Sequence, residues 1–221
     1  MGACSCEKLS YSTEETTIRH EEFKLQFNRV SLSKCLAVFS KYSHENIITR
    51  EDFEFGMDEL ALPYQSKHLD ECLDDFYRSI FRSNELSIKK LLVTAIFLCK
   101  ASTNYKAELL FDTYDSDRNY NLSPLEIDCM LEDLFHVACI ELPRMVSYKS
   151  SGADFITVHN YLVLVQSVRH KLSDNIKNII IQSDRFVSRS AFLYRMSCAP
   201  LTNLLCSSAF RRMHKEEFDK L

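Results

Sequence analysis

Hydrophobic residues recur at intervals of three and four along most of the chain, which is the spacing of one face of an α-helix. The clearest stripe lies in residues 124–136, at Ile127, Met130, Leu131, Leu134 and Phe135. The same spacing predicts helices within residues 21–39, 54–62, 68–81, 106–114 and 200–221. Residues 88–99 form the most apolar helical segment, so we expect them at the centre of the fold. The pattern as a whole predicts an all-α protein.

A loose repeat divides this helical pattern. Five times, a branched apolar residue is followed by Ser or Thr and then, four residues further on, by another apolar residue; the copies begin at Ile48, Leu86, Leu122, Ile156 and Val187. Each copy would be a helix, a short extended link, a Ser or Thr cap and a second helix. Val30 and Val93 match the same template out of step, so the template alone is weak evidence for a repeat. The main support comes from the third copy.

The third copy overlaps a segment, residues 115–126, in which oxygen-bearing groups recur at two-residue steps. Set against the twelve-residue calcium-binding loop, positions 1, 3, 5, 7, 9 and 12 are Asp115, Asp117, Asn119, Asn121, Ser123 and Glu126. Asn121 would use its backbone carbonyl, Ser123 its hydroxyl or a bridging water, and Glu126 both carboxylate oxygens. A helix capping box explains Ser123 and Glu126 but not the other residues. The spacing therefore predicts one Ca²⁺ site.

Two residues inside this segment weaken the predicted site. Tyr120 stands at loop position 6, where glycine normally makes the sharp turn, and a non-glycine residue with positive φ costs about 1–2 kcal/mol. Arg118 adds a positive charge beside the ion. We expect an affinity of about 10⁻⁵ to 10⁻⁴ M, or a site that a bound partner must order. The sequence leaves open whether Tyr120 abolishes binding.

On these residues the chain resembles the EF-hand family, and specifically its lobed calcium sensors. The stretch 110–117, Leu-Phe-Asp-Thr-Tyr-Asp-Ser-Asp, is similar to the third hand of neuronal calcium sensors and calcineurin-B-like proteins. The resemblance implies paired helix–loop–helix units in two lobes, with very short β links between their loops. The expected divisions are a flexible tail (1–15), an N-terminal lobe with two degenerate units (16–100) and a C-terminal lobe (101–221) with the calcium-loop hand at about 106–136.

The other four copies lack acidic first and last ligands together, so they are expected to be degenerate units that serve as scaffold. Either the fourth or the fifth copy could pair with residues 115–126. After the last unit, the C-terminal lobe is expected to end in a helix.

The resemblance also implies a protein partner that docks a helix in an apolar groove. Calcium would fix the angle between the helices that flank the loop, and the groove would be formed by Phe111, Tyr114, Ile127, Met130, Leu134 and Phe135. Residues 192–210 are similar to the segment that covers or competes for this groove in neuronal calcium sensors. This nominates Leu201, Leu204 and Leu205 as a lid.

The first residues, Met-Gly-Ala-Cys-Ser-Cys, resemble an N-myristoylation signal. Gly2 would carry the myristoyl chain, although Cys6 stands where Ser or Thr is usual. One acyl chain gives only marginal membrane binding, so palmitoylation of Cys4 and Cys6 would supply the second anchor. We expect a cytoplasmic protein at the cytoplasmic face of a membrane; the alternative is an unmodified tail.

Composition excludes several other classes of protein. Glycine is rare, at three in 221 residues, which argues against a P-loop, a dinucleotide turn or a hairpin-rich β-sandwich. The net charge of −4 lacks the basic excess of a nucleic-acid-binding protein. Nine irregularly spaced cysteines favour a reducing compartment. Because no nucleophile elbow or HExxH motif is present, we expect neither an enzyme nor a small-molecule substrate.

Two hypotheses for function follow. The first is a non-catalytic, calcium-responsive, acylated protein that regulates a partner by binding its helix. The second is a metal-free scaffold subunit that holds a complex together constitutively. A calcium titration separates them.

Overall fold

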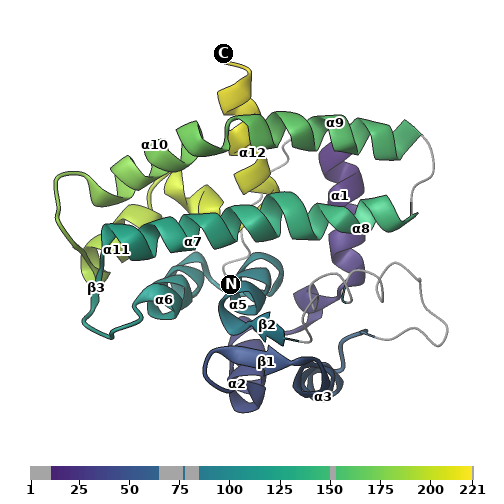
Figure 1. Cartoon of the computed structure of the whole chain (residues 1–221), viewed down its shortest axis with the longest axis horizontal. Coiled ribbons are helices and arrows are strands. Elements are labelled where there is room, and N and C mark those ends of the chain that lie inside the picture. Colours follow the sequence, from purple (N-terminus) through teal and green to yellow (C-terminus); the bar gives the residue numbers. More distant parts are fainter. Residues whose placement is uncertain (1–10, 65–76, 78–84, 150–152, 221) are drawn as a thin grey trace.

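The computed structural model describes residues 11–64, 77, 85–149 and 153–220. It is mostly helical, as the hydrophobic spacing predicts (Figure 1). The first half contains α1 (Thr13–Lys24), the 3-10 turn η1 (Phe27–Arg29), α2 (Leu32–Tyr42), α3 (Arg50–Leu60) and α5 (Ile88–Leu98). The second half contains α6 (Thr103–Tyr114), α7 (Pro124–His136), the π-turn η2 (Val137–Glu141), α8 (Leu142–Lys149), α9 (Ala153–Ser167), α10 (Arg169–Ile181), α11 (Arg189–Met196), the 3-10 segment η3 (Leu201–Leu205) and α12 (Ser207–Phe218). Apart from residue 77, the helix predicted over 68–81 lies outside the described residues.

The Ser and Thr residues of the repeat mark helix starts at four of the five copies. Thr49, Ser87, Ser123 and Ser188 are the N-cap residues of α3, α5, α7 and α11. All of them except Ser87 accept a hydrogen bond of 3.1–3.3 Å from the backbone N–H three residues further on. Such a bond satisfies one of the N–H groups that a helix start leaves unpaired.

The prediction that the fourth copy of the repeat marks a helix start is wrong. Thr157 lies inside α9, which already begins at Ala153. One Ser or Thr beside apolar residues fits the interior of a helix as well as a cap, so the template could not distinguish the two. Residues 153–167 therefore add a continuous helix rather than a helix–loop–helix unit.

The extended links pair in two antiparallel sets. Strands β1 (Ile47–Thr49) and β2 (Glu85–Ser87) pair with Ile48 opposite Leu86. Strands β3 (Asn121–Leu122) and β4 (Val187–Ser188) pair with Leu122 opposite Val187. The fifth copy, and not the fourth, therefore pairs with residues 115–126.

One continuous core runs through both halves of the chain. Its buried side chains extend from Ile18 to Met213, and α5 packs against α2, α6 and α7. Val93, Ala95 and Ile96 are fully buried, which confirms the central position predicted for residues 88–99. The residues assigned to the two expected lobes thus contribute to a single core.

The N-terminal helix packs with the C-terminal half of the chain. Helix α1 lies against α8 and α9 (Figure 1), although the sequence placed residues 16–100 together in one lobe. The helix begins at Thr13 with Ser12 as its cap, so the tail predicted over residues 1–15 ends earlier. Glu15 is already buried.

A buried ion cluster joins α1 to α12. Arg211 is fully buried, and its guanidinium donates two hydrogen bonds to the Glu15 carboxylate (2.8 and 2.9 Å) and one to Glu22 (2.9 Å). It also donates to the carbonyl of Ala138 at 2.8 Å, while the Tyr161 hydroxyl donates to Glu15 at 2.6 Å. Burial raises the pKa of Glu22, although Arg211 acts in the opposite direction. The first and last described helices are thereby tied to each other and to η2.

Candidate metal centre

The predicted calcium segment forms the turn between α6 and α7. Asp115 is the C-cap residue that directly follows α6, and Ser123 and Glu126 form a reciprocal capping box at the start of α7, with Pro124 at its first position. Proline suits that position because its missing N–H would have no partner there. The two helices therefore fix both ends of the segment.

Three of the six predicted ligands bring their carboxylates together. Oxygens of Asp115, Asp117 and Glu126 all lie within 4.8 Å of one another. Asp115 is only 8% exposed, whereas Asp117 lies at the surface. The cluster is thus open to solvent on one side and backed by the helices on the other.

The aspartates hold the turn by accepting hydrogen bonds from its backbone. Asp115 accepts from the N–H of Asn119 at 3.1 Å through Oδ1 and from the N–H of Tyr120 at 3.0 Å through Oδ2. Asp117 accepts from the N–H of Asn119 at 3.2 Å. These bonds wrap the backbone around the carboxylates, so that the loop curls about the position where a cation would sit.

Glu126 joins the two ends of the loop. Its Oε1 accepts from the backbone N–H of Ser116 at 3.1 Å. Its Oε2 accepts from the N–H and the hydroxyl of Ser123 at 2.9 and 2.8 Å. The side chain at loop position 12 therefore reaches back across the turn to the end of α6, as a bidentate ligand must.

The other predicted ligands surround this cluster. Asn119 donates from its amide to Asp117 at 2.7 Å, and its Oδ1 accepts from the N–H of Asn121 at 2.7 Å. Ser123 is engaged with Glu126, as described above.

Tyr120 has the backbone conformation that loop position 6 was expected to require. Its φ is +61°, in the left-handed region that favours glycine. The side chain is 70% exposed, so packing does little to offset the cost. Its carbonyl accepts from the N–H of Arg189 at 3.0 Å, which extends the contact between this loop and the one before α11. Arg118 also has a positive φ, of +57°.

Sequence reasoning missed a cation that approaches the loop from α5. Lys89 donates to the hydroxyl of Ser116 at 3.0 Å and lies 5.2 Å from the ring centroid of Tyr114. Tyr114 in turn donates its hydroxyl to Asp133 at 2.8 Å. Lys89 precedes the loop by more than twenty residues, and no spacing rule places it there; only the packing of α5 against α6 does.

The described residues fit a hard divalent cation. Calcium takes six to eight oxygen ligands at about 2.3–2.6 Å, so ligands on opposite sides of the ion are about 4.6–5.2 Å apart. The three carboxylate oxygens lie within 4.8 Å of one another, so one ion of this size could contact all three. Three carboxylates supply the negative charge that a divalent ion prefers, and nitrogen or sulfur ligands of a zinc site are absent from this group.

The residues predicted to form the partner groove are all buried in this structure. All six of its residues are at most 1% exposed: Phe111, Tyr114, Ile127, Met130, Leu134 and Phe135. The ring of Phe111 lies 5.5 Å from that of Phe192 on α11, and η3 and α11 both pack against α6. The C-terminal segment thus buries these residues in the core.

The lipidation residues Gly2, Cys4 and Cys6 lie outside the described residues. Within the part of the chain that the structure describes, no helix combines the length and the apolar character that a bilayer span needs. Comparison of the chain with protein-family profiles, curated proteins and solved structures finds no match.

Proposed function

We propose that the chain is a calcium-binding, EF-hand-like sensor or adaptor with one site at residues 115–126. One observation carries this proposal: Asp115, Asp117 and Glu126, which the ligand spacing nominated, converge within the span of a calcium ion. The antiparallel pairing of β3 with β4 supports it, because the resemblance implies loops that work in pairs.

The site is expected to be weak. Tyr120 holds a positive φ without glycine's freedom, and Lys89 and Arg118 place positive charge near the loop. An affinity of about 10⁻⁵ to 10⁻⁴ M would make the protein respond only to strong local calcium rises, or when a partner is bound.

The proposed partner is a protein helix that takes the place of η3. Leu201, Leu204 and Leu205 on η3 are buried, and η3 packs against α6, on which Phe111 and Tyr114 lie. An amphipathic helix of similar apolar character could cover the same surface. Calcium would act by changing the angle between α6 and α7, and with it the surface of α6 that η3 contacts.

Membrane attachment through the N-terminus belongs to the same proposal. Myristoylation of Gly2, with palmitoylation of Cys4 and Cys6, would hold the protein at the cytoplasmic face of a membrane. Replacing both cysteines with serine should keep the myristoyl chain and loosen membrane retention, because a single chain binds marginally.

A metal-free scaffold is the second candidate, and two observations favour it. The residues expected in the groove are buried, and Glu126 already closes the loop through hydrogen bonds to Ser116 and Ser123. A protein with these properties could hold a complex together without any ion.

Calcium-dependent thermal unfolding tests the proposal against the scaffold. For an affinity of 10⁻⁵ to 10⁻⁴ M, 1 mM calcium should stabilise the folded chain by about 1.4–2.7 kcal/mol. For a chain of this size, this raises Tm by about 3–10 °C. Magnesium at the same concentration is the control, and chelation should reverse the effect.

The opposite result has a definite meaning. Unchanged melting and unchanged tryptic cleavage up to millimolar calcium would leave the scaffold as the better account. A truncation that removes the C-terminal segment is unsuitable as a test, because it would also remove β4 and Arg211, which belong to the folded core.

A further inference from the structure

Two loops lie side by side at one end of the molecule, on the left in Figure 1. They are the calcium segment, residues 115–126, and the connection between α10 and α11, residues 182–188. Leu122 and Val187 face each other where β3 pairs with β4, and both are fully buried. Because alternate residues of a strand point to opposite faces, the residues beside this pair face away from the core. We call the surface of these two loops the loop end.

The loop end exposes three large apolar side chains. Tyr120 is 70% exposed, Leu125 71% and Phe186 48%. Single exposed apolar residues are common on protein surfaces, but several on adjoining segments indicate an interaction surface. The three side chains thus offer apolar area that another surface could cover.

Two exposed arginines lie beside these side chains. Arg118 belongs to the calcium segment, and Arg185 directly precedes Phe186, with its guanidinium 5.4 Å from the centroid of that ring. Neither arginine forms an ion pair within the described part of the chain, whereas Arg195 nearby is paired with Asp184 at 2.6 Å. Aromatic and aliphatic side chains next to cations are typical of surfaces that contact the interface of a membrane.

Calcium would change the net charge of the loop end. The three carboxylates of the metal group carry three negative charges. Arg118 and Arg185, together with Lys89, which approaches the loop from α5, carry three positive charges. Asp184, the remaining charged residue of the two loops, is paired with Arg195. The loop end is therefore close to neutral without the ion, and a bound Ca²⁺ would leave an excess of two positive charges.

We propose that the loop end binds an anionic phospholipid bilayer when the calcium site is occupied. Tyr120, Leu125 and Phe186 enter the interface, and Arg118 and Arg185 face the headgroup phosphates. The calcium dependence rests on the proposed function, which it deepens by naming what the occupied site recognises. The positive excess matches an anionic surface, and side chains that project from the end of the molecule enter a bilayer without needing a matching pocket.

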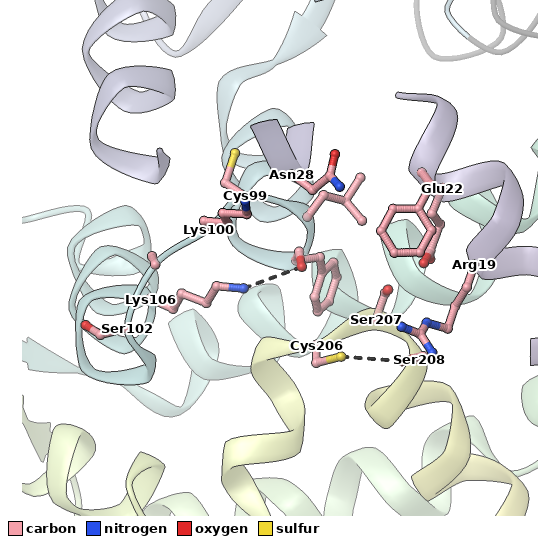
Figure 2. A pocket seen from close by; sticks show the side chains of 14 residues that line it. Arg19, Glu22, Asn28, Cys99, Lys100, Ser102, Lys106, Cys206, Ser207 and Ser208 are labelled. Atoms are coloured by element: carbon pink, nitrogen blue, oxygen red, sulfur yellow. Dashed lines mark hydrogen bonds between the residues drawn. The ribbon is translucent and has the colours of Figure 1, made fainter. Parts of the chain in front are cut away.

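A second surface that could contact a membrane lies around the cavity shown in Figure 2. This cavity, of about 710 Å³, lies between α1, the connection from α5 to α6, and the start of α12. Its lining also combines an exposed apolar residue, Phe23, with cations such as Arg19. None of its lining residues belongs to the loop end. Calcium bound at residues 115–126 would leave the charge of this cavity unchanged, so a membrane contact there would not depend on calcium.

Co-sedimentation with vesicles tests the proposal. Full-length protein prepared without N-acylation is mixed with phosphatidylcholine vesicles that contain about one third phosphatidylserine, in millimolar calcium, millimolar magnesium or a chelator. Each positive charge near such a surface tightens binding about fivefold, so calcium should tighten it about 25-fold. Vesicles of phosphatidylcholine alone lack the negative charge, and calcium should not increase binding to them.

Two variants with matched controls localise the contact. Arg185→Gln should weaken binding in calcium about fivefold, with the exposed Arg29→Gln as control. Phe186→Ser should weaken it about three- to tenfold, because about half of the side chain remains to be buried. Phe23→Ser is the control, since Phe23 is similarly exposed but lines the cavity. Thermal unfolding confirms that each variant is folded.

A third variant separates the calcium site from calcium that merely bridges phosphatidylserine to acidic groups of the protein. Glu126→Gln removes one negative charge and a predicted calcium ligand. Without calcium it should bind the vesicles about fivefold more tightly than the unmodified chain. Calcium should then add nothing, whereas unspecific bridging would still increase binding.

Three results would overturn the proposal. These are no gain in vesicle binding with calcium, a gain that Glu126→Gln retains in full, and a loss in Phe23→Ser as large as that in Phe186→Ser. Thermal unfolding with calcium but without vesicles shows which idea has failed. If calcium raises Tm and does not increase vesicle binding, the bilayer is excluded and the proposed function stands. If calcium does neither, both are wrong.

Discussion

Replacing Glu126 with Gln separates the structural and the metal-binding roles of one side chain. The carboxylate accepts hydrogen bonds from the N–H of Ser116 through one oxygen, and from the N–H and hydroxyl of Ser123 through the other. The amide of Gln has the same shape but only one acceptor oxygen. If that oxygen keeps the capping box with Ser123, the NH₂ group faces the N–H of Ser116, and this bond is lost.

The structure sets the size of the expected effects. A hydrogen bond to a charged group contributes about 1.5–3 kcal/mol, but Ser116 is exposed, so water can replace the lost acceptor. The free energy of unfolding without calcium should therefore fall by about 1 kcal/mol. Calcium binding should fall far more, to about 10⁻³ M or weaker, because the ion loses a charged bidentate ligand.

Two measurements check this prediction. Urea unfolding in the presence of a chelator gives the structural effect, and calorimetric calcium titration gives the affinity. Glu51→Gln is the control, since Glu51 is an exposed first-turn residue of α3. If Glu126→Gln binds calcium as tightly as the unmodified chain, the assignment of residues 115–126 as the metal site is wrong.

Three further changes test other parts of the reasoning. Tyr120→Gly should relieve the strain of the positive φ and tighten calcium binding by up to about thirtyfold, as measured by the same titration. The increase in affinity is smaller if part of the relieved strain stabilises the calcium-free fold instead. Gly2→Ala should abolish N-acylation and shift the protein from the membrane to the soluble fraction on centrifugation. Burial lowers the pKa of His214 in the folded chain to about 4. As pH falls below 6.5, the unfolded chain therefore takes up a proton at this histidine before the folded chain does, and the free energy of unfolding falls by about 3 kcal/mol by pH 4. His214→Phe should remove that part of the acid sensitivity in unfolding experiments, whereas exposed His170→Phe should not.

Sequence periodicity predicted the helices whose buried faces are apolar. Helix α7 begins and ends at the predicted residues, because a capping box, a proline and a five-residue apolar stripe all agree there. Helix α1 was missed before residue 21 because three of its four buried residues are glutamates: Glu15, Glu21 and Glu22. Glu15 and Glu22 are buried against Arg211, nearly two hundred residues away, and no local pattern contains that partner.

The candidate site was predictable only in part for the same reason. The two-residue steps of Asp115 and Asp117 placed carboxylates on one side of a turn, and the capping box fixed Glu126 opposite them. Lys89 comes from α5, outside the loop and its two flanking helices, so its approach to the loop depends on tertiary packing. The closure of the groove likewise depends on Phe192 and η3, which local spacing cannot position.

Helices η3 and α12 are held in place by different interactions. The free energies of these interactions limit which of the two elements calcium binding could displace. Releasing α12 would leave Glu15 and Glu22 without Arg211, at a cost of about 3–5 kcal/mol. Exposing three buried leucines of η3 would cost about 1.5–3 kcal/mol each. The coupling available from one weak site is only about 1–3 kcal/mol. Under the proposed function, calcium alone would therefore open neither part, but it could decide whether a partner helix that covers the apolar surface of α6 displaces η3, while α12 stays anchored to α1.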